Sequence, residues 1–449
     1  MRTRTMARVV GLALLALPAA ACEFISPTES NPNAVPTANV DQLFTGIEVN
    51  TYFVAEGQLS RLSSMWIQQM TGTDRQFKTL DNYVLTEEDA AGEFSTIYTG
   101  GGLQDLKNAI AQATSGGRRV YAGILKIHQA YMFGMAASVW GDIPYSEAAN
   151  PAIATPKLDK QADVYAAVQK LLDEAISDLA SGAGAGPGAV DFNFSGNAAR
   201  WTAVARTLKA RFYLHLAEVS GNTAYQSALA EAQQGIAANA GNWRAIHSTD
   251  SKENNLWYQF MRDRSGYIGG GDYLVPSMVA RADSRLPFYY SQSGGTYRAR
   301  ASLLSTQAGG YGALDYNSPI ATCAENAYIR AEAQYRLGNV AGARTAATDG
   351  LVCEEGSFAV SLTALKGRIT AASGQALLDE IMLQKYTALF LNIEAWNDWK
   401  RTCLPKITQR PAGMPARLFY GQDERQTNPN IPAVDKQPKR NANDPNACT

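Results

Sequence analysis

The sequence is poor in the residues and motifs that most enzymes and metal proteins need. Only 3 of its 449 residues are histidine, so a histidine-rich metal site is not expected. It has no Gly-x-Ser-x-Gly elbow, no phosphate loop ending in Gly-Lys-Ser or Gly-Lys-Thr, no His-Glu-x-x-His and no Gly-x-Gly-x-x-Gly after a strand. These absences argue against the commonest hydrolase, nucleotide and zinc-protease sites. We therefore expect no catalytic set, no cofactor and no metal.

The chain also lacks an excess of positive charge and lacks long hydrophobic runs. It has 40 basic and 41 acidic residues, and its formal charge of −1 becomes −4 without the three arginines among the first eight residues. Nucleic-acid binding needs a basic surface, so that class of partner is not expected. After residue 21, no segment approaches the ~18 consecutive apolar residues that a membrane-spanning helix needs.

The first 21 residues have the pattern of a secretory signal. Three arginines precede the apolar run Val9–Leu17, and small residues lead up to Cys22. A lipoprotein peptidase would leave Cys22 acylated, whereas an ordinary signal peptidase would cut at the same alanines. The position three residues before the cysteine is Ala19, where leucine is usual. We expect lipidation, because residues 22–38 then form a polar tether to the membrane.

Four cysteines follow Cys22, an even number that favours disulfides in an exported protein. Cys323 lies just before one expected helix and Cys353 just after its antiparallel partner, so both fall at the same end of a hairpin and should pair. Cys403 and Cys448 remain for each other, and their bond would hold the C-terminal tail on the body. The alternative is a set of reduced, unconnected thiols.

Apolar residues at three- and four-residue steps predict helices that return on themselves as hairpins. Small alanines on the returning helices allow close approach, as in tetratricopeptide repeats. The fold class is therefore mostly α, with about four such hairpins forming a scaffold. The expected helices are 118–140 with 163–179, 204–219 with 225–236, 328–335 with 340–351, and a fourth unit that begins with Ala376–Trp399.

The segments between the hairpins differ in kind. Residues 241–320 hold 12 aromatic residues in 80 positions, well above the 9% of the whole chain, together with several glycine pairs. This composition predicts a loop-rich insertion with little regular helix. We expect it to separate an N-terminal helical part, residues 39–240, from a C-terminal helical part, residues 321–449. A second irregular region runs from Thr71 to Gly102.

Five blocks in a fixed order carry a resemblance to a known family. They are Trp140-Gly141-Asp142-Ile143-Pro144-Tyr145, Asp283-Ser284-Arg285-Leu286, Arg330-Ala331-Glu332-Ala333, Glu394-Ala395-Trp396-Asn397-Asp398-Trp399, and Arg417-Leu418-Phe419-Tyr420 followed by Asn428-Pro429-Asn430. The sequence resembles the SusD/RagB family of outer-membrane nutrient-binding lipoproteins, although Ser284 and Gly421 stand where the family has proline. The resemblance implies four tetratricopeptide-like units and a ligand face built from the loops around the first hairpin and the insertion.

Aromatic rings on loops supply the candidate ligand site. The C–H face of a sugar is apolar and its hydroxyls are polar, so a glycan site combines flat rings with Asn, Asp, Arg or Gln. Both kinds of side chain occur together in the two irregular regions, although each ring could instead be buried in a core. The candidate ligand-binding residues are Asp74, Arg75, Phe77, Tyr83, Tyr98, Tyr297, Tyr311 and Tyr316.

The sequence leaves three functional hypotheses. The first is a surface lipoprotein that captures an oligosaccharide or similar nutrient and passes it to a SusC-like TonB-dependent transporter in the outer membrane. The second is a tetratricopeptide-type scaffold at the cell envelope that binds other proteins. The third is a glycoside hydrolase, suggested only by Glu394 and Asp398, which lie one turn apart. Two carboxylates on one helix more often form a solvated or ion-paired face, here with Lys400 or Arg401.

Overall fold

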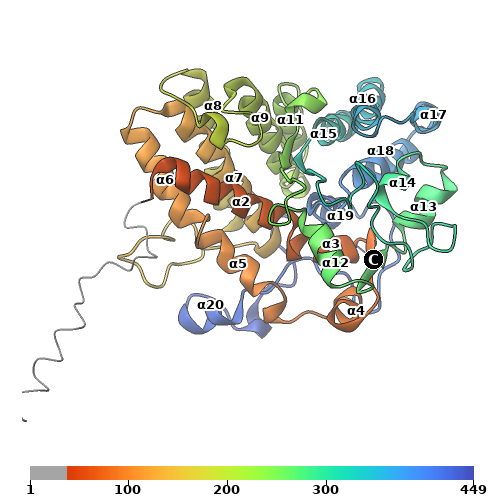
Figure 1. Ribbon diagram of the computed structural model, residues 1–449, viewed down its shortest axis with the longest axis horizontal. Coiled ribbons are helices and arrows are strands. Elements are labelled where there is room, and N and C mark those ends of the chain that lie inside the picture. Colours follow the sequence, from red (N-terminus) through yellow and green to blue (C-terminus); the bar gives the residue numbers. More distant parts are fainter. Residues whose placement is uncertain (1–37, 449) are drawn as a thin grey trace, which may run out of the picture. The chain divides into compact units, whose positions relative to one another are not determined.

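The computed structural model describes residues 38–448, and every element below belongs to the unit that begins at Val40. The expected signal sequence, tether and Cys22 lie outside the described residues. The structure is mostly helical (Figure 1). Its first half contains α2 (Val40–Glu56), α3 (Gln58–Trp66), β1 (Met70–Gly72), α4 (Arg75–Asp81), η2 (Glu87–Ala90), α5 (Ala91–Tyr98), α6 (Leu103–Ser115), α7 (Arg119–Trp140), α8 (Gln161–Ala180), η3 (Gly188–Val190), α9 (Ala198–Leu214), α10 (Ala217–Ser220) and α11 (Asn222–Ala232).

The second half begins with the short elements of the aromatic-rich region and ends in longer helices. In chain order it contains η4 (Asn239–Gly241), β2 (Trp243–Ala245), α12 (Leu256–Asp263), β3 (Ile268–Gly270), α13 (Leu274–Ala280), α14 (Leu286–Tyr289), β4 (Ser318–Ala321), α15 (Cys323–Arg336), α16 (Val340–Phe358), α17 (Thr363–Ala371), α18 (Gln375–Ala388), α19 (Glu394–Thr402), α20 (Gln422–Thr427) and η5 (Val434–Lys436). Within residues 38–448, none of the helices combines the length and hydrophobicity that a membrane crossing requires.

The predicted helical hairpins are present and stack in sequence order. Helix α7 packs on α8, α9 on α11, and α15 on α16, while α8 also packs on α9 and α11 on α15. Figure 1 shows α8, α9, α11, α15 and α16 following one another. The fourth unit consists of α18 and α19, of which α18 lies mainly against α15. Small residues allow this spacing, because a Cβ on Gly134 of α7 would lie 2.2 Å from the Phe212 ring of α9.

Three helix ends differ from the expectation, the first being that of α11, which stops at Ala232 and does not reach Ile236. Helix α9 ends at Leu214, so the predicted stripe does not reach Val219, whose side chain is 55% exposed in the separate helix α10. Helix α16 continues to Phe358 and therefore contains Cys353, which was expected beyond its end.

Helix α7 is buried on nearly all sides, whereas its sequence predicted one apolar face. The reason is that α6, α8 and α9 all pack against it.

Trp140 and the residues after it connect α7 to the C-terminal tail. Gly141 has a φ of 76°, which a side chain would strain, and it ends the helix. The Trp140 indole donates a hydrogen bond to the Phe419 carbonyl at 3.0 Å, and Arg417 donates to the Trp140 carbonyl at 2.7 Å. Asp142 accepts from the backbone N–H of Gln161 at 2.9 Å and so caps α8. Two of the family blocks therefore meet here.

Both predicted disulfides are present, Cys323–Cys353 and Cys403–Cys448. The first joins the beginning of α15 to α16. The second joins the end of α19 to the last described residue, with Cα atoms 5.2 Å apart. The tail is held further by Asn443, whose amide donates to the His215 carbonyl at 2.7 Å. The C-terminal segment is thus fixed on the helical body.

Candidate ligand-binding site

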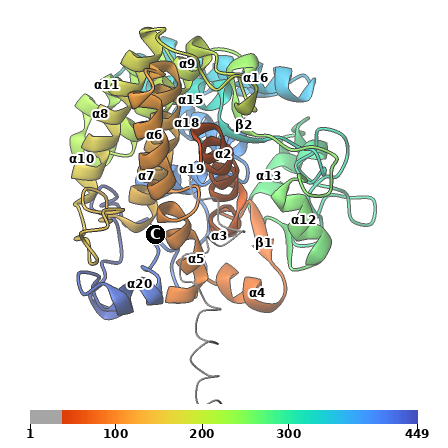
Figure 2. The same cartoon turned by 60° about the vertical axis from the view of Figure 1, so that its left-hand side comes forward.

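A two-stranded antiparallel sheet joins the two irregular regions that the sequence singled out. Strand β1 follows α3, and strand β3 belongs to the aromatic-rich region, with Thr71 opposite Gly269. Past the end of the sheet, the Thr73 N–H donates to the Tyr267 carbonyl at 2.9 Å. Figure 2 shows β1 beside α3 and α4, with α12 and α13 next to it. Gly271, just after β3, permits close approach to the chain before β1, because a Cβ there would lie 1.9 Å from the Gln68 carbonyl oxygen.

This pairing places exposed polar groups of α4 beside a ring of the insertion. The Arg75 guanidinium carbon lies 5.4 Å from the centroid of the Tyr267 ring. Asp74 caps α4 by accepting the Arg75 N–H at 2.8 Å. The side chains of Arg75 and Asp74 are 65% and 63% exposed. We call the surface formed by Thr73, Asp74, Arg75, Tyr267, Asp272 and Arg300 the α4–β3 surface.

A charged cluster at Asp272 fixes Arg300, one of the two arginines of this surface. Asp272 accepts two hydrogen bonds from Arg300, at 2.9 and 2.6 Å, and a third from Arg410 at 2.6 Å. Burial alone would raise the pKa of the Asp272 carboxyl, but the bonds from Arg300 and Arg410 outweigh it and lower the pKa. Arg300 itself remains 56% exposed. The surface therefore presents the Tyr267 ring, the exposed Arg75 and an Arg300 guanidinium that Asp272 holds in one orientation.

Two of the predicted site residues lie beneath this surface and do not face solvent. The Phe77 ring is 3% exposed and packs on Phe260 with centroids 5.1 Å apart. The Tyr83 ring is 5% exposed, and its hydroxyl donates to the Trp66 carbonyl at 2.8 Å. Both rings belong to the core that supports α4. A ligand does not reach them in this conformation.

Tyr311 and Tyr316 meet in a different place, a cavity of about 270 Å³ between the insertion and α16. Their ring centroids are 4.6 Å apart, and Tyr311 also packs on Phe390. Burial raises the pKa of both phenols well above the ordinary value. Tyr297 is half-buried and packs against the main core. The structure therefore does not gather the three insertion tyrosines into one platform.

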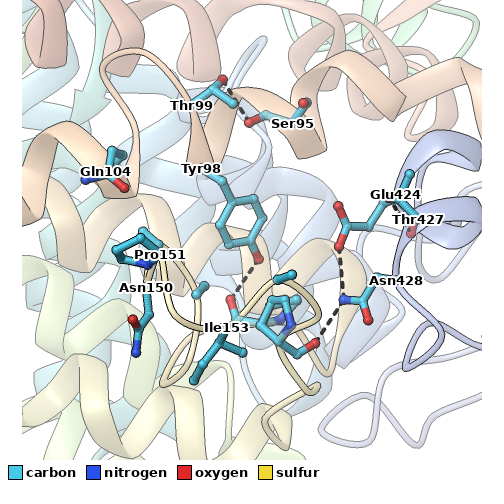
Figure 3. Close-up of a pocket in the computed structure, with 15 residues that line it drawn as sticks. Ser95, Tyr98, Thr99, Gln104, Asn150, Pro151, Ile153, Glu424, Thr427 and Asn428 are labelled. Atoms are coloured by element: carbon cyan, nitrogen blue, oxygen red, sulfur yellow. Dashed lines mark hydrogen bonds between the residues drawn. The ribbon is translucent and has the colours of Figure 1, made fainter.

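Tyr98 lines a third place, a cavity of about 460 Å³ between α5, α20 and the loop after α7. In Figure 3 its hydroxyl points to the Pro144 carbonyl, at 2.9 Å. The ring is wedged between Phe94 and Phe133, with centroids 5.3 and 5.8 Å away. Across the cavity the Asn428 amide lies 3.3 Å from the Glu424 carboxylate. Tyr98 thus forms a wall of this cavity and ties α5 to the turn after Trp140.

Tyr267, Asp272 and Arg300 were not predicted from the sequence. A signal for the first two was available, because they flank Gly269-Gly270-Gly271. A run of glycines inside a strand marks close approach of another backbone. The residues on either side of such a run are therefore candidates for the surface where two segments meet.

The two carboxylates that suggested a hydrolase are both buried and ion-paired. Glu394 lies 2.7 Å from the His215 Nε2 atom, and Asp398 accepts from Arg401 at 2.6 Å. Burial would raise the pKa of Glu394, but His215 and Arg211 lower it to about 2. The two acids therefore have separate structural partners. Within residues 38–448, no three His, Cys, Asp or Glu side chains gather in a way that could hold a metal ion.

Comparisons with known proteins agree with this architecture. No curated protein sequence matches the chain significantly. A chitin-binding SusD homologue from Flavobacterium johnsoniae is similar in structure, with a TM-score of 0.75 at 18% identity over 90% of this chain and 98% of that one. A chitin-binding protein has a TM-score of 0.73 at 22% identity over 91% of this chain and 100% of its own. A SusD/RagB family protein from Bacteroides thetaiotaomicron VPI-5482 has a TM-score of 0.71 at 21% identity, over 90% and 97%.

At these identities the structural likeness establishes the fold alone, whereas a family model matches the sequence itself. The model of the SusD-like_2 family, described as starch-binding and associating with the outer membrane, matches residues 32–420. Because this match spans well over half of the chain, the protein belongs to the SusD-like family.

Proposed function

We propose that the protein is a non-enzymatic lipoprotein of the outer membrane that captures an oligosaccharide at the α4–β3 surface and passes it to a TonB-dependent transporter. The family description names starch binding and association with the outer membrane, and two similar structures are chitin-binding proteins. The anchor would be an acyl group on Cys22, facing the cell exterior. Capture requires no bond-making residues, which fits the separate structural partners of Glu394 and Asp398.

The observation that carries the proposal is the exposed Arg75 guanidinium over the half-buried Tyr267 ring, with Asp74 next to it. A sugar ring can lie on the face of an aromatic side chain while its hydroxyls bond to charged and amide groups. Here the Arg75 guanidinium covers part of the Tyr267 ring. An arriving sugar can share that ring face or displace the guanidinium, and the cations around Asp272 are already held in place for its hydroxyls.

Calorimetric titration with chitin and maltose oligosaccharides tests this assignment. We expect one of the two series to bind, and Arg75→Ala and Tyr267→Ala to weaken that binding about tenfold, the equivalent of ~1.4 kcal/mol. Arg368→Ala, which removes another exposed arginine on α17, is the matched control and should bind like the wild type. Since Arg75 is exposed, its loss should leave the fold intact.

Two results would contradict this assignment. If no glycan binds in the titration, carbohydrate is excluded as the ligand class. A loss of binding in Gln104→Ala, with Arg75→Ala unaffected, would move the site to the cavity of Figure 3, which Gln104 lines.

Delivery to a transporter is tested separately by affinity purification from solubilised outer membranes. The expected result is recovery of a large TonB-dependent barrel protein with the tagged chain. Recovery of soluble envelope proteins instead would favour the interaction scaffold that the helical hairpins also allow.

A further inference from the structure

A third cavity, separate from the α4–β3 surface, lies along α2. It has a volume of about 670 Å³ and is bounded by α2, by the loop at residues 189–195 and by residues 246–259. We call it the α2 groove. A volume of this size holds a drug-sized molecule or several sugar rings. Its apolar lining residues are Val49, Phe53, Ala189, Phe192, Ile246 and Leu256.

Several exposed apolar side chains lie together in the groove. Among the described residues, nine large apolar side chains are exposed, and Phe53 and Phe192 are the only aromatic ones. Both line the groove, with 38% and 46% of their surface exposed, and Val49 beside them is 56% exposed. A cluster of apolar surface within a concavity marks a site for a ligand or partner.

Two buried polar residues of the groove, Asp191 and Tyr52, already have partners inside the protein. The Asp191 carboxylate accepts four hydrogen bonds, from the backbone N–H groups of Asn193, Phe194 and Gly196 and from the Trp201 indole, at 2.7–3.0 Å. The Tyr52 hydroxyl accepts from the Asn193 amide at 3.0 Å. A sugar would have to compete for these groups, whereas an apolar ligand leaves their bonds intact.

The opposite wall of the groove is held in one conformation. His247 lies between two acceptors, with Nε2 2.9 Å from a Glu56 carboxylate oxygen and Nδ1 3.1 Å from the Glu253 carbonyl. Glu56 also accepts the Leu256 N–H at 3.2 Å, and the Asn254 amide closes the loop by donating to the Ser248 carbonyl at 3.1 Å. A wall fixed in this way costs little entropy when a ligand binds.

The rim of the groove favours neither an anion nor a cation. Lys252 and Glu253 are both exposed and adjacent in the chain, so their opposite charges offset each other. The ligand is therefore selected mainly by its apolar surface.

We propose that the α2 groove is a second ligand site, which takes the aromatic or branched aliphatic body of a small molecule and is independent of the sugar-binding surface. Phe53 and Phe192 contact the ligand from two sides, and Val49 and Leu256 complete the apolar contact. Hydrophobic burial supplies the affinity, because Asp191 and Tyr52 keep their internal partners.

Fluorescence titration with the neutral probe N-phenyl-1-naphthylamine tests the proposal. The full chain would carry Cys22→Ser, so that no acyl group can take up the probe. We expect saturable binding of one probe per chain, weakened about tenfold by Phe53→Ser or Phe192→Ser because each removes apolar contact area. Ala189→Trp should fill the groove and abolish saturable binding.

A matched pair of valines controls for general surface effects. Val49→Ser removes an exposed valine inside the groove and Val279→Ser one outside it, with 56% and 48% exposure. Only Val49→Ser should weaken the probe, and oligosaccharide titrations should be unchanged in every variant. Far-ultraviolet circular dichroism and melting temperature check that each variant folds.

Three outcomes would overturn the proposal. The first is probe uptake that does not saturate, and the second is binding that Ala189→Trp and Phe192→Ser leave unchanged. The third is a loss of oligosaccharide binding in Phe192→Ser with the probe unaffected, which would make the groove a sugar site.

If probe uptake does not saturate and Phe192→Ser also loses a co-purifying membrane protein, the groove binds a protein partner and the small-molecule proposal is wrong. The oligosaccharide proposal is tested separately, by the effect of Arg75→Ala and Tyr267→Ala on oligosaccharide binding.

Discussion

Single residues of the family blocks serve mainly the interior of the protein. Arg285 is fully buried and donates to Asp283 at 2.6 Å and to Glu354 at 2.6 Å. Arg401 bonds both oxygens of Glu332, and these two attractions, with Lys385, lower the pKa of Glu332 to about 2 although burial would raise it. Breaking one partner of such a pair leaves a buried charge alone, at a cost of about 3–5 kcal/mol. The recognisable sequence therefore identifies the fold and contributes little to the ligand surface.

Glu48 is a buried acid that lacks such a partner. It is fully buried on α2, its Oε1 atom has no hydrogen-bond partner, and its Oε2 atom lies 3.5 Å from the Phe192 nitrogen. Burial first, and then the negative charge of Asp191, raise the pKa of Glu48 to about 9. The folded protein therefore holds Glu48 protonated at neutral pH. This preference stabilises the fold fully below pH 4.5 and is lost progressively as pH rises towards 9.

We predict that Glu48→Gln stabilises the protein at neutral pH by roughly 2–3 kcal/mol, because the amide needs no proton from solvent. At pH 4 the variant and the wild type should be equally stable. Urea unfolding at pH 4 and pH 7.5 measures both. Glu88→Gln, at an exposed glutamate, is the control and should change neither value. Equal stability of Glu48→Gln and wild type at pH 7.5 would refute the assignment.

The candidate site could be predicted as a region but not residue by residue. The sequence indicated that residues 71–102 and the insertion carry the ligand face, and β1 and β3 do pair there. It could not tell that Phe77 and Tyr83 face inward while Asp74 and Arg75 face solvent. Irregular segments have no fixed period, so the sequence pattern does not report which side is buried.

Among the secondary-structure elements, the long helices were predictable because their apolar period continues for several turns. The pairs α7–α8, α9–α11 and α15–α16 follow this rule. The end of α9 was not predictable, since an apolar residue such as Val219 fits the period even after the helix has stopped. The short helices α12, α13 and α14 have too few turns for a period, and their packing partners are far away in sequence.

Two glycines inside neighbouring helices give a direct test of helix packing. A Cβ on Gly350 of α16 would lie 2.6 Å from the Tyr328 ring of α15, whereas one on Gly367 of α17 would meet nothing within 4 Å. We predict that Gly350→Ala destabilises the protein by about 1–3 kcal/mol, because the buried Tyr328 ring cannot move aside. Gly367→Ala should stabilise it by about 0.5–1 kcal/mol through helix propensity.

Chemical denaturation of both variants gives the two free energies. If Gly350→Ala were as stable as Gly367→Ala, the close contact between α15 and α16 would not determine their spacing.

At the scale of the whole molecule, segments far apart in sequence pack against one another around one core. The tail after α19 returns to the end of α7, and β2 and β4 pair across the insertion. Cys403–Cys448 fixes the tail across a sequence separation of 45. A cross-link over a loop of this length restricts the unfolded chain and contributes on the order of 3–4 kcal/mol. The even number of cysteines predicted this closure, but no sequence pattern predicted that Trp140 would contact Phe419.

His128 lies where α2, α7, α9 and β2 meet. It is on α7, fully buried, with its ring 5.4 Å from Phe44 of α2, 5.4 Å from Trp201 of α9 and 5.1 Å from Trp243 of β2. Its Nδ1 atom is 3.0 Å from the Thr51 hydroxyl, and its Nε2 atom has no partner. Burial lowers the pKa of His128 to about 3. The folded protein therefore holds this imidazole neutral.

This burial predicts a loss of stability in mild acid. The unfolded chain binds a proton on His128 as pH falls through about 6.5, and the folded protein does not until about pH 3, so the stability present above pH 6.5 is lost over that window. Between pH 7 and pH 5 the loss should be about 2 kcal/mol. His128→Phe keeps the ring packing and cannot titrate, and Thr51 retains its bond to the Ile47 carbonyl. The free energy of unfolding in urea should fall about 2 kcal/mol less for the variant than for the wild type between these two pH values. If the free energy of unfolding fell equally in both proteins, another group would cause the acid sensitivity, and the assignment to His128 would be wrong.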